Sequence, residues 1–181
     1  LNIANRSSEN FSGIAPYFNE HVRKELEKID KDLGVNIYRD GLKIHTTIDP
    51  KVQQILEKSF QENMSENQTV LNKEFINNPW RLKKVIKGTD YSVDEILEIL
   101  KNNETIPRVL RDKLLVQGAM VAIDPSNGNI LGMIGGRQEE EYIDLHGFNR
   151  ATQAKRQPGS IFKPFIYMTA LEEGFTTSTQ L

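Results

Sequence analysis

The chain has 181 residues, a formal net charge of −2 and 38% hydrophobic residues, which suits one domain or one domain with a linker. The near-neutral charge gives no electrostatic reason to expect a nucleic-acid partner. Cysteine is absent, which excludes disulfides, thiolate metal sites and a cysteine nucleophile. The three histidines lie far apart and lack the spacing of metal ligands, so no metal site is expected.

The two ends of the chain lack the usual signs of a complete protein. No initiator methionine or signal peptide opens it, and no apolar run approaches the ~20 residues of a membrane span. We interpret the chain as a fragment of a longer parent protein. Any membrane anchor would then belong to an N-terminal part of the parent that lies outside these residues.

The first predicted helix begins at Pro16, because proline suits the first helical turn, and ends at Gly34. Its apolar residues recur at helical spacing and predict one buried face. These residues are Phe18, Val22, Leu26 and Ile29.

Residues 42–48 alternate apolar and polar side chains over most of their length, which predicts a strand. Asp49 and Pro50 then predict a helix start, with a capping acceptor followed by a proline at the first helical position. The expected buried stripe of that helix consists of Val52, Ile55, Leu56 and Phe60.

Residues 61–117 carry fewer signals and favour small helices joined by polar turns. Ser92 and Glu95 have the spacing of a capping box, which predicts a helix start. The apolar residues that follow are Ile96, Leu97, Ile99 and Leu100.

An antiparallel hairpin is predicted from residues 118–124 and 129–135, two apolar runs joined through Asn127 and Gly128. Asn-Gly favours such turns because both residues tolerate positive φ. Nearly every position of both runs is apolar, so we expect both faces of the hairpin to be covered.

After a polar loop over 137–158, residues 160–173 predict a helix that Gly174 stops. The segment is mostly apolar, so we expect it to be buried on most sides and to pack against the hairpin. The predicted fold class is therefore α+β, an antiparallel hairpin with helices.

Ser160 and Lys163 place a hydroxyl and an amine three residues apart, on one face of the predicted helix. A neutral lysine can take the proton of a serine that attacks a carbonyl, and a helix N-terminus favours the negative charge that develops. On spacing alone, a capping serine with a solvated lysine is the commoner explanation.

The neighbouring residues favour the catalytic interpretation. Segment 156–165, with the sequence RQPGSIFKPF, resembles the nucleophile segment of class A, high-molecular-weight penicillin-binding proteins, a family whose first signature is Ser-x-x-Lys. Further stretches resemble the same family in the same order. They are 15–18 with 22–26 (APYF, VRKEL), 41–49 (GLKIHTTID), 121–137 (from VAIDP to GGR) and 148–152 (FNRAT).

The resemblance implies an incomplete serine β-lactamase-like transpeptidase fold. It divides the chain into a linker (1–50) that follows an absent glycosyltransferase domain, a helical segment (51–117), and the N-terminal part of the transpeptidase domain (118–181). It implies that Ser160 is the nucleophile and Lys163 its base, in D-Ala–D-Ala transpeptidation through an acyl-enzyme. Neither a metal nor an organic cofactor is implied.

The implied partners are peptidoglycan stem peptides, β-lactam antibiotics and the remainder of the transpeptidase domain. The implied location is extracytoplasmic, on a membrane-anchored parent. Ile161 departs from the small residue that often follows the nucleophile in this family, and the second and third signatures do not follow Ser160. Two alternatives stay open: a β-lactamase-type hydrolase, against which the linker-like residues 1–50 argue, and a non-catalytic binding or scaffold fragment.

Overall fold

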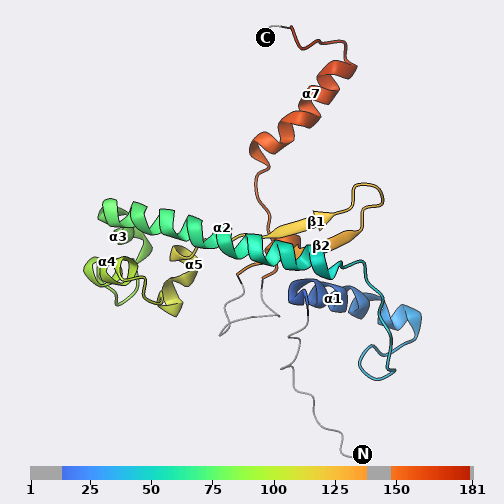
Figure 1. The fold of residues 1–181 in the computed structure, drawn as a ribbon, viewed down its shortest axis with the longest axis horizontal. Coiled ribbons are helices and arrows are strands. Elements are labelled where there is room, and N and C mark those ends of the chain that lie inside the picture. The colour runs from blue at the N-terminus through green and yellow to red at the C-terminus, as the bar shows by residue number, and fades with distance from the viewer. Residues whose placement is uncertain (1–13, 138–147, 180–181) are drawn as a thin grey trace, which may run out of the picture.

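The computed structural model describes residues 14–137 and 148–179. A long helix runs through the middle of the molecule, with a two-stranded antiparallel sheet and the first helix near one end and a group of short helices near the other (Figure 1). The α+β class predicted from the sequence is confirmed.

Helix α1 (Pro16–Leu33) has the predicted bounds, and Gly34 follows it with φ of +64°. Its N-terminal end is the buried part: Phe18 forms a small core with Ala15 and Met133, against which Val22 packs. The predicted apolar face loses its cover toward the C-terminus, where Ile29 is exposed.

Helix α2 (Pro50–Asn77) starts where the sequence predicts. The carboxylate of Asp49 accepts hydrogen bonds from the backbone N–H groups of Lys51 and Val52. The helix continues for 28 residues, or about 42 Å, so the expectation of small helices from residue 61 onward was wrong for 61–77. Its apolar residues pack on the sheet along one half and on the short helices along the other, so the whole length is supported.

Short helical segments form a lobe with its own apolar core around the C-terminal half of α2. The segments are η1 (Pro79–Arg81), α3 (Leu82–Val85), α4 (Val93–Lys101), η2 (Arg108–Leu110) and α5 (Arg111–Leu114). The predicted capping box opens α4: the backbone N–H of Glu95 donates to Ser92 Oγ, and that of Ser92 donates to the Glu95 carboxylate. The hydrogen bonds that the backbone N–H and the hydroxyl of Ser92 donate to the carboxylate lower the pKa of Glu95. The core itself consists of Phe75, Leu82, Ile96, Leu100, Ile106, Leu110 and Leu114.

The predicted hairpin is present as β1 (Met120–Ile123) and β2 (Ile130–Ile134). Gly128 has φ of +78° in the turn, but Asn127 is not among the residues with positive φ, so only the glycine adopts the conformation expected of the Asn-Gly pair. Asp124 accepts from the backbone N–H and the hydroxyl of Ser126, which lowers the pKa of its carboxyl. The register is irregular between Ala122 and Ile123, and Leu131 has no partner in β1.

The strand predicted over 42–48 is absent, because that segment has no regular pairing. Only its end reaches the sheet, where Thr47 Oγ1 donates to the carbonyl of Ile130. The next residue but one, Asp49, donates its backbone N–H to the carbonyl of Leu131, the residue that β1 leaves unpaired. Asp49 therefore both caps α2 and ties the helix start to β2.

The side chain of Gln53, which is fully buried, links α2 to β2 through hydrogen bonds. Its Oε1 accepts from the backbone N–H of Met133 at 2.9 Å, and its Nε2 donates to the Met133 carbonyl at 3.3 Å and to Glu57 at 2.8 Å. Both backbone groups of Met133 face away from β1, as in a pair of antiparallel residues that do not bond each other. The amide thus occupies the place of a neighbouring strand.

The predicted buried stripe of α2 was therefore only partly right. Phe60 is buried, but Ile55 is 65% exposed, while the polar Gln53 occupies the most enclosed position. A second glutamine repeats the arrangement along the helix. Gln68 donates to the carbonyl of Leu114 and accepts from the N–H of Val116. These two hydrogen bonds tie α2 to the segment that leads from α5 into β1.

We expect Gln53→Leu to lower the free energy of unfolding by about 2–4 kcal/mol, because two backbone groups of Met133 lose their partner inside the protein. Gln54→Leu is the matched control, because Gln54 is the neighbouring residue on the exposed face of α2 and should change stability by less than about 0.5 kcal/mol. Urea midpoints followed by far-UV circular dichroism at low protein concentration measure both. Equal midpoints for the two variants would contradict the role of Gln53.

Candidate functional site

The segment that leads to Ser160 is fixed to the end of β2 by Asn149, a buried residue that caps the short helix α6 (Arg150–Gln153). Its Oδ1 accepts from the N–H of Ala151, and its Nδ2 contacts the carbonyl of Tyr17 at 3.4 Å. The backbone N–H of Arg150 donates to the carbonyl of Gly135 at 2.9 Å. These contacts join α1, α6 and the end of the hairpin.

Gly135 is needed at this junction because a side chain there would not fit. A Cβ on Gly135 would lie 2.3 Å from Asn149 Oδ1 and 2.5 Å from Tyr17 Cδ1. The two neighbours are themselves held, one as a helix cap and the other as a ring buried under the hairpin. In the sequence, Gly135 is only the last residue of the predicted strand 129–135, and its closeness to Asn149 could not be inferred from spacing.

Ser160 lies in a 3₁₀ turn, η3 (Gly159–Phe162), which runs directly into α7 (Lys163–Glu172). Lys163 donates its backbone N–H to the Ser160 carbonyl, so the two residues are one 3₁₀ turn apart, a geometry in which side chains at i and i+3 align. Gly159 has φ of +54°, which favours glycine. The structure thus places both predicted residues together at the N-terminus of the predicted helix, which Gly174 ends with φ of +89°.

Both residues are exposed, and within the described ranges neither side chain has a hydrogen-bonding partner. A lysine that acts as a base needs surroundings that disfavour its charge, such as burial or a nearby cation. The described residues place the hydroxyl and the amine on one turn, but they leave the lysine exposed to solvent.

Two expectations about α7 were wrong. Figure 1 shows α7 projecting away from the hairpin, and its apolar side chains are exposed, with Ile161 in the preceding turn 78% exposed. A mostly apolar helix is buried only when other segments cover it, and no described segment does so. The expectation that both faces of the hairpin are covered was also wrong, because Val121 and Ile123 of β1 are exposed on one face.

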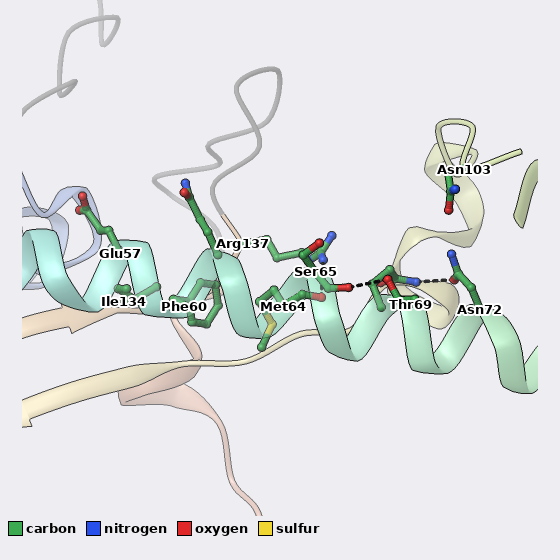
Figure 2. Close-up of a pocket in the computed structure, with 11 residues that line it drawn as sticks. Glu57, Phe60, Met64, Ser65, Thr69, Asn72, Asn103, Ile134 and Arg137 are labelled. Carbon is green, nitrogen blue, oxygen red and sulfur yellow. Dashed lines mark hydrogen bonds between the residues drawn. The ribbon is translucent and has the colours of Figure 1, made fainter.

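A pocket of about 580 Å³ lies along α2, and neither Ser160 nor Lys163 lines it. Phe60 and Met64 form part of its apolar wall, while Arg137 and Asn103 reach it from segments outside the helix (Figure 2). Some of its polar groups already have partners: Thr69 donates to the Ser65 carbonyl, and Gln68 holds the Leu114–Val116 backbone. No residue pattern in the sequence indicates this pocket.

Residues 14–137 and 148–179 lack two further kinds of site. No group of three or more His, Cys, Asp or Glu side chains is placed to hold a metal ion. No helix in these ranges is long and apolar enough to cross a membrane.

Residues 118–181 match the family model described as the penicillin binding protein transpeptidase domain. The match covers β1, β2, α6 and the Ser160 turn, together with α7. No solved structure matches the chain.

Curated relatives extend the similarity beyond that domain. The chain is 30% identical to penicillin-binding protein 2D of Bacillus subtilis over 91% of its own length and 17% of the relative's. It is 45% identical to penicillin-binding protein 1A of Neisseria lactamica over 45% of the chain and 10% of that protein, and 49% identical to penicillin-binding protein 1A of Pseudomonas aeruginosa over 35% and 7%. The chain therefore spans less than a fifth of these relatives. These relatives share the name penicillin-binding protein, and the chain is similar to one segment of each.

We expect Gly135→Ala to destabilise the chain by about 2–4 kcal/mol, because the new methyl group overlaps two held side chains. Gly118→Ala is the comparison, because its Cβ would lie 3.2 Å from the terminal methyl of Met64 and 3.3 Å from Phe60 Cε2, contacts that small shifts of these side chains relieve. Its cost should stay below about 1 kcal/mol. Urea midpoints measure both, and a Gly135→Ala midpoint equal to that of Gly118→Ala would rule out the close approach.

We also expect the chain to self-associate through its exposed apolar helix. Phe165→Glu combined with Leu171→Glu should shift it toward monomer, because both side chains are exposed in α7. The control replaces the exposed Thr169 of the same helix with Glu. Sedimentation velocity measures the distribution, and a monomeric unsubstituted chain would contradict the expectation.

Proposed function

We propose that the chain is part of a class A penicillin-binding protein and that Ser160 is the nucleophile of its D-Ala–D-Ala transpeptidase, with Lys163 as the base. The observation that carries the proposal is the Ser-x-x-Lys pair on one 3₁₀ turn at the start of α7, inside the region that matches the transpeptidase family. The names of the relatives support the same family.

In the proposed reaction, Ser160 Oγ attacks the carbonyl carbon of the penultimate D-alanine of a peptidoglycan stem peptide. Lys163 takes the hydroxyl proton and returns it to the departing amine, so the amide C–N bond breaks and D-alanine leaves. An amine of a neighbouring strand then attacks the ester, forms the cross-link and frees Ser160. A β-lactam enters the first step and stays bound as an ester on Ser160.

The electrostatic setting of the serine supports its role. Ser160 precedes the first α-helical residue by one 3₁₀ turn, so the positive N-terminal end of the α7 dipole lies close to the negative charge that develops at Ser160. Pro158 and Gly159 shape the approach, since Gly159 adopts a left-handed conformation that other residues adopt at a cost of about 1 kcal/mol or more. The local backbone is thus suited to holding the hydroxyl at the tip of the turn.

We further propose that residues 1–50 are a linker after a glycosyltransferase domain, 51–117 a helical segment of the transpeptidase region, and 118–181 the start of the transpeptidase domain. The exposed apolar side chains of β1 and α7 support this division, because a continuing domain would cover them and would also desolvate Lys163. The parent would act outside the cytoplasm, held by a membrane anchor.

Ser160→Ala in the parent protein should abolish covalent labelling by penicillin, because the attacking oxygen is lost. Lys163→Ala should slow acylation about 10²–10⁴-fold, or about 3–5 kcal/mol of barrier, because the base is lost. Lys163→Arg should not restore the rate, since arginine stays protonated. Intact-mass analysis over time measures the adduct.

Ser126→Ala and Ser178→Ala are the matched controls, since neither serine has a lysine three residues further on. Both should label like the unsubstituted protein. An adduct that persists in Ser160→Ala, or that maps to another serine, would overturn the assignment. No adduct in the unsubstituted parent would point to the non-catalytic scaffold instead.

A further inference from the structure

The turn between α2 and α4 carries an unbalanced positive charge. Residues 79–89 contain Arg81, Lys83, Lys84 and Lys87 and no aspartate or glutamate. The only tryptophan of the chain, Trp80, lies in the same turn and is 61% exposed. In a chain whose net charge is −2, this is a local excess of cations beside an exposed aromatic ring.

The helical geometry separates these residues from the apolar ones. Leu82 is fully buried in the lobe core, and Val85 and Ile86 pack against it. Trp80, Lys83 and Lys84 are exposed at three- to four-residue spacing along η1 and α3, on the side opposite Leu82, and Lys87 is exposed in the turn that follows α3. We call this surface the basic face, and it consists of Trp80, Lys83, Lys84 and Lys87.

The lysines of the basic face are not neutralised by the described residues. Arg81 is the exception in this turn, because it pairs with Glu74 at 2.7 Å while its guanidinium lies over the Trp80 ring, 5.4 Å from the ring centroid. Within residues 14–137 and 148–179, Lys83, Lys84 and Lys87 have no ion pair. Asp90, exposed beyond Gly88, is the nearest acidic residue after them in the sequence.

The turn is also held rigidly enough to present a surface. Lys113 of α5 donates its Nζ to the carbonyl of Val85, which adds a further cation beside α3 and ties the turn to the rest of the lobe. The guanidinium of Arg81 lies over the Trp80 ring and restricts the position of the ring on that side. Binding would therefore order few new groups. Figure 1 shows α3 at the end of α2 that lies far from the hairpin.

We propose that the basic face binds the surface of an anionic phospholipid bilayer. Lysines are attracted to lipid phosphates, and tryptophan prefers the boundary between headgroups and acyl chains, where its ring is in an apolar layer and its N–H stays hydrated. A soluble polyanion would satisfy the lysines but offers no such layer to Trp80. The combination of unpaired cations and one exposed indole therefore favours a bilayer.

The expected binding is weak and depends on salt. Each lysine near an anionic surface strengthens binding about fivefold, so the three together contribute roughly 100-fold. Such a contact orients a protein on a membrane that something else holds it to, and does not anchor it alone. The proposal is independent of Ser160 and Lys163, so it can fail without affecting the assignment of the nucleophile.

The single tryptophan makes the test direct. The chain is titrated with vesicles of phosphatidylcholine, with and without phosphatidylglycerol, while the emission of Trp80 is recorded. Anionic vesicles should shift the emission to shorter wavelength, and the shift should shrink as ionic strength rises. Neutral vesicles should leave it unchanged. Brominated lipids should quench Trp80 if the ring reaches the acyl boundary.

The variant Lys83→Gln, Lys84→Gln, Lys87→Gln should weaken binding roughly 100-fold. The matched control, Lys43→Gln, Lys51→Gln, Lys155→Gln, removes the same charge from exposed positions elsewhere and should bind like the unsubstituted chain. Circular dichroism verifies that both fold.

Two outcomes would overturn the proposal. If the triple-substituted variant still binds anionic vesicles and they do not shift the emission of Trp80, the contact lies on the apolar helix α7. If inorganic polyphosphate binds as tightly as anionic vesicles and depends on the same three lysines, while vesicles cause no blue shift, the basic face binds a soluble polyanion instead.

Discussion

The amide of Gln53 stands beside β2 where a third strand would otherwise lie, and the surrounding segments are arranged about that contact. A strand edge inside a protein must find partners for its backbone groups, because an unpaired buried N–H or C=O costs as much as a lost hydrogen bond. Here the partners come from three different places: the Asp49 backbone at Leu131, the Gln53 side chain at Met133 and the Arg150 backbone at Gly135. The edge is therefore satisfied without regular pairing, and each partner brings its own segment into position.

The path to Ser160 starts from this edge. Arg150 and Asn149 fix the start of the lead-in segment at Gly135, where the absence of a side chain lets Tyr17 and Asn149 approach. Beyond α6 the chain leaves the body, and the conformation at Ser160 is set locally by Pro158, Gly159 and the start of α7. The conformation of the Ser160 turn is thus determined by nearby residues, while its direction depends on where β2 ends.

Apolar residues that remain exposed are concentrated on β1, η3 and α7, within the region that matches the transpeptidase family. Burial of these faces and desolvation of Lys163 both require additional protein segments packed against α7. In the function proposed above, completing the domain would therefore complete the core and the base together. The lobe around α4 differs, because its seven buried side chains already form a closed core, which leaves the basic face on its surface free for another purpose.

The sequence by itself determined those features whose partners lie within a few residues. Asp49 capping α2, the Ser92–Glu95 box, the positive φ of Gly128 and the helix start beside Ser160 all follow from local hydrogen bonds and φ preferences. Only the tertiary structure decided which faces are buried: Gln53 is enclosed and Ile55 is not, residues 42–48 stay irregular, and α7 is exposed. The physical reason is that burial and edge pairing depend on groups distant in the sequence, which periodicity along one segment does not specify.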